Sequence, residues 1–272
     1  MTLTFSQAPL STSRRTEVNY DLQGPEHLLL FDRFPRRVRA VFGGETVLDT
    51  DRGRLLHESS HLPVLYVRDS DVRDDLLRQT EHTTYCPFKG DAAYWSVVAG
   101  DSAREDRVAE NAVWAYPDPI EQASWLRGYK AFYPAAMDEW WDEDEQVQAL
   151  RDPYHRVDSR HTKRRVRVLH GADVLADSDL AVVLSETGLP NRYYLPADDV
   201  DWQRLEASEM TAHCPYKGDA AYWSLTPSDG SDPVADVAWS YREPFENALK
   251  TKGHLCFLHD DLVTEVDGEQ VG

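Results

Sequence analysis

Apolar and polar residues alternate over short segments of this chain, as they do in half-buried β-strands. Residues 37–42 alternate in this way and run into Gly43-Gly44, and residues 45–48 return as the second strand of a hairpin. Further strands are expected over residues 64–67, 93–98, 113–116, 165–170 and 192–195. Residues 71–77 are typical of one or two helical turns. Short strands, frequent turns and little helix predict a mainly β protein built from small barrels or folded sheets.

The chain contains an internal repeat. Residues 86–96 read CPFKGDAAYWS and residues 214–224 read CPYKGDAAYWS, so only one position of this segment differs. The offset of 128 residues continues upstream, where it places His27 over His155, Glu58 over Glu186 and Tyr66 over Tyr194. After a gap of three residues the match resumes and reaches Phe132 and Phe257. Two copies of this length predict two tandem domains rather than a solenoid of short repeats.

The domain boundaries follow from the repeat. We expect an N-terminal arm over residues 1–26, a first repeat over 27–134, an acidic helical linker over 135–154, a second repeat over 155–265 and a C-terminal tail over 266–272. In the linker, Met137, Trp140 and Trp141 recur at helical spacing before the acidic run 142–145. The linker is therefore predicted to be a short helix whose Trp face packs on the first domain.

Charge and cysteine content narrow the function classes. The formal net charge of -19 argues against binding to nucleic acid or to an anionic membrane, both of which require clustered Lys and Arg. No segment has the roughly 18 apolar residues of a membrane helix. From the charge we expect no nucleic-acid or membrane partner. Three widely spaced cysteines are not a disulfide framework, so we expect a cytoplasmic location. Because the domain is duplicated, we also expect the two repeats to pack on each other.

The repeated Cys-Pro-aromatic-Lys-Gly segment is predicted to be a shaped loop between strands. Cys86 and Cys214 each precede a lysine, Lys89 or Lys217, by three residues, and a nearby cation can activate a thiol as a nucleophile. No histidine near the cysteine is kept in both copies, however. A small buried side chain is the alternative interpretation of each cysteine.

Metal and nucleotide signatures are weak. The chain lacks the paired C-x2-C spacing of structural zinc and also lacks phosphate-cradling glycine motifs, so we expect no zinc and no cofactor. An Asp-x-Asp occurs in each copy, at residues 49–51 and 177–179. Such a pair can hold a divalent metal, but it directly follows a hairpin strand, which favours a capped turn.

Aromatic residues are the most suggestive feature. Each copy keeps an adjacent Tyr-Trp pair and a Trp-x-Tyr pair, which are Tyr94-Trp95 and Trp114, Tyr116 in the first copy and Tyr222-Trp223 and Trp239, Tyr241 in the second. Because side chains alternate along a strand, Trp114 and Tyr116 are expected to share one face, whereas only one of Tyr94 and Trp95 can join them. These rings form either an aromatic core or a pocket with Lys89 or Lys217 as a polar anchor.

Three functions remain open from these residues. The first is binding of a small cyclic or cationic ligand in an aromatic pocket of each repeat. The second is an enzyme that uses Cys86 or Cys214 with lysine assistance in acyl or nucleotidyl transfer. The third is a scaffold that binds no ligand.

The order of these motifs resembles a bacterial family. A Gly hairpin, a Tyr-rich strand, the segment from Cys86 to Ser96, a W-x-Y-x-x-P motif and a G-x-x-A-F-like ending at Gly128 are similar to domain-of-unknown-function family 427 in its tandem form. The resemblance covers residues 27–142 and 155–265. At the second ending, Cys256 stands where the family has a small residue.

The resemblance implies a β-tent, or Mss4-like, fold in which two antiparallel sheets meet at an angle. Relatives with this architecture often hold zinc at C-x2-C pairs, which this chain lacks. Others bind cyclic ligands in aromatic cages, which by analogy favours a pocket at Trp95, Trp114, Trp223 and Trp239. The family also carries a nucleotidyltransferase-like label, but this sequence has no matching G-S…D-x-D constellation.

Overall fold

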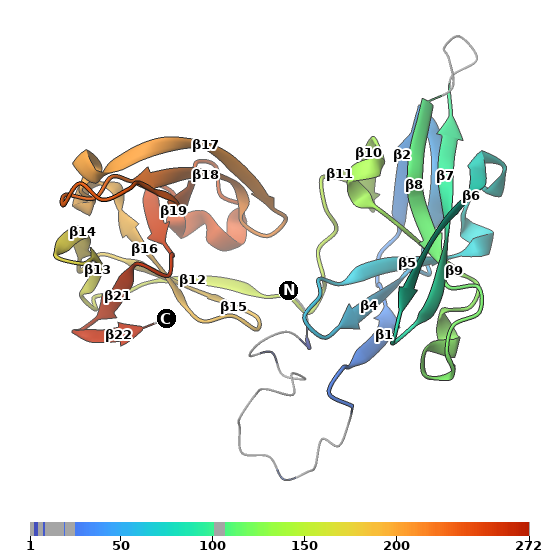
Figure 1. The fold of residues 1–272 in the computed structure, drawn as a ribbon, viewed down its shortest axis with the longest axis horizontal. Helices are drawn as coiled ribbons and strands as arrows, with labels where there is room; N and C mark the ends of the chain where they lie inside the picture. The colour runs from blue at the N-terminus through green and yellow to red at the C-terminus, as the bar shows by residue number, and fades with distance from the viewer. Residues whose placement is uncertain (1–2, 5–7, 9–18, 20–24, 101–106, 272) are drawn as a thin grey trace. The chain divides into compact units, whose positions relative to one another are not determined.

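A computed structural model describes residues 3–4, 8, 19, 25–100 and 107–271 (Figure 1). The chain divides into two compact units, residues 1–154 and 155–272. Most of the expected N-terminal arm, residues 1–26, lies outside the described residues. Each unit contains one seven-stranded and one four-stranded antiparallel sheet, and the two units have the same strand order. The prediction of two mainly β domains is therefore confirmed.

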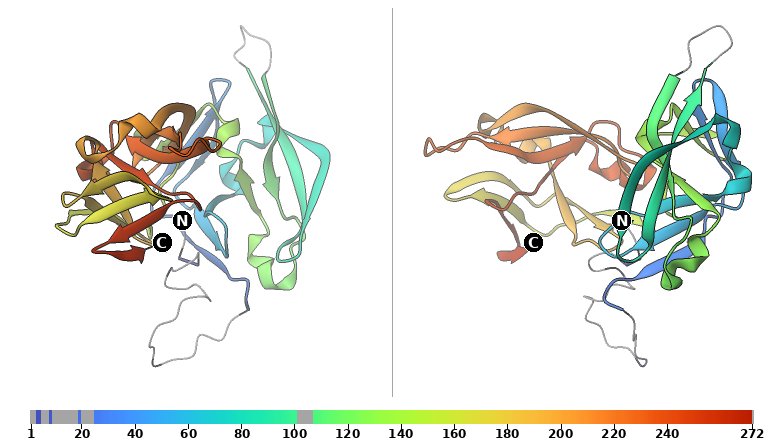
Figure 2. Two further views of the ribbon diagram at one scale, coloured as in Figure 1. Left: turned by 60° about the vertical axis from the view of Figure 1, so that its left-hand side comes forward. Right: turned by 45° about the vertical axis from the view of Figure 1, so that its right-hand side comes forward.

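The first unit is built from eleven strands in the described residues. Its seven-stranded sheet has the order β1 (Leu29–Arg33), β4 (Arg54–Glu58), β5 (Val64–Arg68), β9 (Tyr129–Phe132), β8 (Arg107–Ala115), β7 (Gly90–Ala99) and β6 (Leu77–Cys86). Its four-stranded sheet has the order β11 (Glu145–Val147), β10 (Glu139–Asp142), β2 (Val38–Phe42) and β3 (Glu45–Thr50). Figure 2 shows the long, bent β6–β7 hairpin from two sides.

The second unit repeats this plan. Its seven-stranded sheet has the order β12 (Val157–His161), β15 (Val182–Glu186), β16 (Arg192–Pro196), β20 (His254–Phe257), β19 (Val234–Tyr241), β18 (Gly218–Leu225) and β17 (Leu205–Cys214). Its four-stranded sheet has the order β14 (Asp173–Ser178), β13 (Val166–His170), β21 (Val263–Val266) and β22 (Glu269–Val271). Each strand has a counterpart at the same place in the first unit.

In the part of the chain that the structure describes, every helical segment is a short 3₁₀ helix. In the first unit they are η1 (Asp69–Asp71), η2 (Asp74–Leu76), η3 (Glu121–Leu126) and η4 (Pro134–Ala136). In the second unit they are η5 (Ala197–Asp199), η6 (Trp202–Arg204) and η7 (Glu246–Thr251). The helical turns expected over residues 71–77 are present as the end of η1 and as η2.

Strand alternation places two cores on the two faces of each seven-stranded sheet. In the first unit one core includes Val38 and Leu48 from the four-stranded sheet and Val67 and Val97 from the seven-stranded sheet. The other face of the seven-stranded sheet carries a second cluster that contains Tyr66 and residues of η3. The second unit has the same two clusters. The candidate site lies in this second cluster.

The predicted helical linker is wrong. Residues 139–142 and 145–147 form the hairpin β10–β11, and β10 pairs with β2. Trp140 packs into the core while Trp141 lies under the guanidinium of Arg39, which is the alternation of a strand. The acidic run makes the turn, with Glu143 at φ 54°. The segment is a strand because its backbone pairs with β2. A short isolated helix would have only its own hydrogen bonds and is marginally stable.

The predicted C-terminal tail is also part of a sheet. Residues 263–266 and 269–271 form the hairpin β21–β22, which pairs with β13 as β10–β11 pairs with β2. Asp267 takes the place of Glu143, with φ 53° against 54°. A short sequence signal marks this equivalence, since Glu-Gln-Val occurs at both 145–147 and 269–271. Each unit therefore closes its four-stranded sheet with its own last hairpin.

Candidate functional site

The predicted aromatic residues separate onto the two faces of the sheet. Tyr94, Trp114 and Tyr116 lie together in the second cluster of the first unit, with Cys86 packed against them. Trp95 packs instead against the core between the sheets, where the ammonium of Lys130 lies 5.6 Å from the centre of its ring. The expectation that only one member of the Tyr-Trp pair joins the Trp-x-Tyr residues is confirmed.

The second unit separates its aromatic residues in the same way. Tyr222, Trp239 and Tyr241 lie in or against its second cluster together with Cys214, whereas Trp223 packs on the other core. We call the residues on this face the aromatic cluster of each unit. They are Tyr66, Tyr94, Trp114 and Tyr116 in the first unit and Tyr194, Tyr222, Trp239 and Tyr241 in the second.

The Cys-Pro-aromatic-Lys-Gly segment is the tight turn of the β6–β7 hairpin in the first unit and of the β17–β18 hairpin in the second. The amide of Lys89 donates to the carbonyl of Cys86 at 3.2 Å, and Lys217 donates to Cys214 at the same distance. The following glycines, Gly90 and Gly218, have φ of 103° and 105°. Only glycine adopts this conformation readily, so each turn requires a glycine directly after its lysine.

In the first unit this lysine belongs to a buried polar triad. The ammonium of Lys89 donates to Oε2 of Glu58 at the end of β4, and Oε1 of the same carboxylate lies 2.8 Å from Nε2 of His27. Lys89 is 8% exposed and Glu58 is 6% exposed. The ring of His27 stacks on Phe88 at 3.6 Å, which holds the imidazole in place.

The second unit builds the same triad. Nζ of Lys217 lies 2.5 Å from Oε2 of Glu186, and Nε2 of His155 lies 2.9 Å from Oε1. His155 packs on Tyr216, the counterpart of Phe88, at 4.1 Å between ring centres. We call these two sets, His27–Glu58–Lys89 and His155–Glu186–Lys217, the His–Glu–Lys triads.

The triads keep their carboxylates ionised in spite of burial. Burial alone would raise the pKa of Glu186, but the hydrogen bond from His155 and the charge and hydrogen bond of Lys217 lower it to about 2. The pKa of Glu58 is lowered by Lys89 and His27 against the same opposing effect of burial. Each lysine therefore has a fixed negative partner rather than a free ammonium.

These domains match one known family over most of the chain. The model of the family described as "Domain of unknown function (DUF427)" matches residues 30–143 and 158–272. The chain belongs to this family. It carries two copies of the domain in tandem, and both matched segments include the Trp residues and the Lys–Glu pair described above. No curated protein matches the chain.

In each DUF427 domain a tryptophan donates across the aromatic cluster. Nε1 of Trp114 lies 3.3 Å from the hydroxyl of Tyr66, and Nε1 of Trp239 lies 3.3 Å from the hydroxyl of Tyr194. Burial raises the pKa of both tyrosines, so these hydroxyls stay protonated. Both tryptophans are only half-buried, which leaves part of each side chain exposed.

The cysteines differ in their surroundings. Cys86 and Cys214 are half-buried against the aromatic cluster of each DUF427 domain, while Cys256 is 1% exposed. Burial raises the pKa of Cys256 to about 12, so its thiol is protonated at neutral pH. The ammonium groups of Lys89 and Lys217 are directed at carboxylates, as described above.

The Asp-x-Asp segments carry surface ion pairs. Asp49 accepts two hydrogen bonds from Arg37, at 2.7 and 2.5 Å, and Asp177 accepts two from Arg165, at 2.8 and 2.6 Å. Among the described residues, no group of three or more His, Cys, Asp and Glu side chains is placed to hold a metal ion. Within the same residues, no helix is long and apolar enough to span a bilayer.

Four residues of the triads were not among the predicted site residues. These are His27, Glu58, His155 and Glu186, which lie 31 positions before their partner in the triad. The repeat contained a signal for them, because each histidine and glutamate recurs at the offset of 128 residues. A charged residue kept at the same place in both copies is a stronger signal than an aromatic one, since aromatics also serve a core.

Proposed function

We propose that each DUF427 domain binds a small cyclic or cationic ligand at its aromatic cluster, beside the His–Glu–Lys triad. One observation carries the proposal: both domains build the same charged triad and, on the same sheet, an aromatic cluster that includes a half-buried tryptophan. Burying an ion pair is seldom more stable than filling the same space with apolar side chains. Its presence in both copies supports a role in recognition as well as in packing.

The triad also has a mechanical role. Glu58 lies on β4 and Lys89 precedes β7, and three strands separate β4 from β7 in the sheet order. The ion pair therefore joins two parts of the sheet that have three strands between them, and it holds them in a fixed relation. A preorganised face of this kind binds a rigid ligand with less loss of conformational entropy.

The surroundings of the indole favour a flat or positively charged ligand. In the first domain the ring of Tyr133, 47% exposed, packs on Trp114 at 4.6 Å. The hydroxyl of Tyr94 pairs with Thr84 at 2.9 Å and supplies a polar edge. Aromatic faces attract flat rings and cations, and the net charge of -19 raises the local concentration of cations.

The experiment is a binding screen with matched variants. Adenine, uracil, choline and 1-methylnicotinamide are titrated against the protein, and binding is followed by saturation-transfer NMR. Trp114→Phe and Trp239→Phe are each expected to weaken binding at their own domain by roughly tenfold. Trp141→Phe on β10 is the control, since that ring packs under Arg39 in the other sheet. Saturation transfer that is unchanged in the double variant W114F/W239F would contradict the proposal.

A second candidate is thiol chemistry at Cys86 and Cys214. It is favoured by the placement of both thiols, half-buried against the aromatic cluster in each domain. Labelling with iodoacetamide under native conditions separates the two functions. Thiols that react only in denaturant exclude a nucleophilic role and leave the binding proposal intact.

The wider setting is also part of the proposal. The two antiparallel sheets of each unit support a β-tent, or Mss4-like, architecture, in which a concave sheet face is the natural ligand site. The three cysteines form no disulfide, which supports a reducing, cytoplasmic location.

A further inference from the structure

Two adjoining hollows open on the first unit at the β1 end of its seven-stranded sheet. We call them the aromatic hollow, of about 330 Å³, and the arginine hollow, of about 240 Å³. The aromatic hollow is lined by Leu29, Leu30, Phe31, Arg54, Trp125 and Tyr129. The arginine hollow is lined by Arg33, Arg52, Arg54, Arg68 and Tyr129. Because Arg54 and Tyr129 line both, one molecule can reach into the two hollows together.

The aromatic hollow offers ring surface for stacking. Phe31 stacks on Trp125 with ring centres 4.7 Å apart and planes inclined by 24°, and Tyr129 meets Phe31 edge-on at 5.1 Å. Phe31 and Trp125 are both half-buried, so this pair keeps exposed ring area. A flat ring of a ligand would extend the stack.

The arginine hollow concentrates positive charge in an acidic chain. Arg54 lies over the ring of Phe31 at 5.5 Å and Arg68 lies over Tyr129 at 5.2 Å, so these two guanidinium groups are held by the aromatic residues. Arg52 pairs with Asp71. Within the described residues, no carboxylate lies within 4.0 Å of the guanidinium nitrogens of Arg33, Arg54 and Arg68.

The neighbouring carboxylate of Asp32 has partners of its own. It accepts from the hydroxyl of Tyr154 and, at 2.8 Å, from the backbone amide of Arg33. The charge of Arg54 also acts on this carboxylate, but the arginine hollow itself is lined by four arginines and no carboxylate, so positive charge is in excess there. Arginine binds carboxylate and phosphate oxygens with paired hydrogen bonds, so the hollow has the chemistry of an anion site.

The second unit does not keep this arrangement. At the repeat offset, Leu180, Val182 and Pro196 stand where the first unit has Arg52, Arg54 and Arg68. Ser159 and Lys250 stand where it has Phe31 and Trp125.

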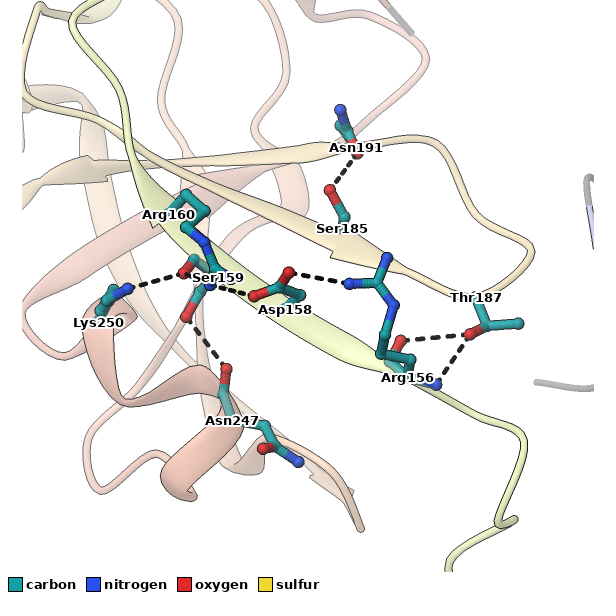
Figure 3. A network of polar contacts seen from close by, with 9 residues as sticks. All are labelled: Arg156, Asp158, Ser159, Arg160, Ser185, Thr187, Asn191, Asn247 and Lys250. Atoms are coloured by element: carbon teal, nitrogen blue, oxygen red, sulfur yellow. Dashed lines mark hydrogen bonds and ion pairs between the residues drawn. The ribbon is translucent and has the colours of Figure 1, made fainter.

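Figure 3 shows the polar network that replaces the aromatic stack. Nζ of Lys250 donates to the carbonyl of Ser159 at 3.0 Å, and the hydroxyl of Ser159 donates to the carbonyl of Asn247 at 3.1 Å. Since the scaffold is the same in both units, packing alone does not require Phe31, Trp125 and the arginines. This difference points to a function that only the first unit has.

We propose that the first unit binds, in the aromatic and arginine hollows, a flat aromatic ring that carries a phosphate or carboxylate group. The ring stacks on Phe31 and Trp125, and the anionic group is held by Arg54 together with Arg33 and Arg68. This site adjoins the aromatic cluster, since Phe31 meets Tyr66 edge-on at 5.9 Å, but its lining residues are different and it does not depend on the function proposed there.

Phenyl phosphate, benzoate, inorganic phosphate and phenol serve as probes, with affinities measured by isothermal titration calorimetry. Phenyl phosphate or benzoate is expected to bind at least tenfold more tightly than inorganic phosphate or phenol. A stronger response to phenyl phosphate identifies a phosphate ligand, and a stronger response to benzoate identifies a carboxylate. Equal affinity for phenyl phosphate and inorganic phosphate, or no binding of either ring-bearing anion, overturns the proposal.

Two variants that install residues of the second unit test the site directly. Arg54→Val and Trp125→Lys are each expected to weaken binding of the ring-bearing anion by tenfold or more, with thermal unfolding recorded to show that the unit is folded. Arg107→Ala, which removes an exposed arginine paired with Asp138, is the control for the loss of one charge. Trp114→Phe leaves this binding unchanged, so failure here and failure of the proposed function are distinguishable. Equal weakening by Arg107→Ala would overturn the assignment.

Discussion

The two units share their triads but differ in the surface next to them. His27–Glu58–Lys89 and His155–Glu186–Lys217 match residue for residue, with the same atoms in contact. Beyond them, the repeat alignment pairs Phe31, Trp125 and Arg54 of the first unit with Ser159, Lys250 and Val182 of the second. Residues that the fold requires recur in both units, whereas residues with a role in one unit occur only there. The shared triad belongs to the domain itself, whereas the residues that line the aromatic and arginine hollows are not repeated in the second unit.

The largest expected change in stability follows from removing the carboxylate of either triad. Glu58→Gln or Glu186→Gln leaves a buried lysine without its negative partner, which destabilises the unit concerned by about 3–5 kcal/mol. The loss at Glu186 should be larger, because the side chain of His155 is fully buried whereas that of His27 is 19% exposed. Urea unfolding of each variant measures the loss.

Matched double variants keep this prediction specific. Glu58→Gln with Lys89→Met, and Glu186→Gln with Lys217→Met, remove both charges and should recover most of the stability. If the single variants unfold at the wild-type urea concentration, the triads do not hold the sheets in the way described.

Acid should weaken the second unit through the same carboxylate. The pKa of Glu186 falls from 4.5 to about 2 on folding, so unfolding takes up a proton in this range. The contribution of this group is complete above pH 4.5 and is lost as the pH falls towards 2, by roughly 3 kcal/mol in total. Urea midpoints measured from pH 5.5 to pH 2.5 test this loss.

The double variant at Glu186 and Lys217 provides the control for the acid effect. Its urea midpoint should vary less with pH than that of the wild-type protein over the same interval. A steeper variation in the variant would contradict the assignment of this proton to Glu186.

A smaller difference between the units lies at a bulge in β8 and β19. Asn111 and Asp236 occupy equivalent positions with φ of 50° and 55°. Oδ1 of Asn111 accepts from the hydroxyl of Thr80 at 2.6 Å, whereas Oδ1 of Asp236 is buried with no hydrogen-bond partner in the described structure. Asp236→Asn should stabilise the second unit by about 0.5–1 kcal/mol, because a buried carboxylate oxygen is costlier than an amide oxygen.

The reverse substitution in the first unit, Asn111→Asp, should have the opposite effect on stability. Asn111→Asp brings a negative charge to a position where an amide now accepts a hydrogen bond, and it should destabilise the first unit by about 1 kcal/mol. Urea midpoints of both variants give the result. A lower midpoint for Asp236→Asn would show that this carboxylate has a role that its surroundings do not reveal.

Local signals in the sequence predicted the local structure well. The alternation of apolar and polar residues predicted strand β2 and the placement of Tyr94 and Trp95 on opposite faces. The Pro and Gly residues predicted the turn at Lys89. Each of these features depends on neighbouring residues alone, so a single sequence contains the information.

Features that depend on distant strands could not be predicted in this way. The partner of Lys89 is on β4, which becomes its neighbour only through the curvature of a seven-stranded sheet. The hairpin β10–β11 was mistaken for a helix for the same reason, since its structure depends on pairing with β2. Likewise, Arg54 and Trp125 come from parts of the chain whose proximity no local pattern indicates.

The last hairpin of each unit sets where the chain can be divided. Since β10 supplies the backbone partners of β2, a fragment that stops at residue 134 would leave one side of β2 without hydrogen bonds. An unprotected strand of this kind recruits other chains and promotes aggregation. A fragment that ends in the segment between Val147 and Val157 keeps every sheet of the first unit whole, which makes that segment the natural point of fusion for a duplicated gene.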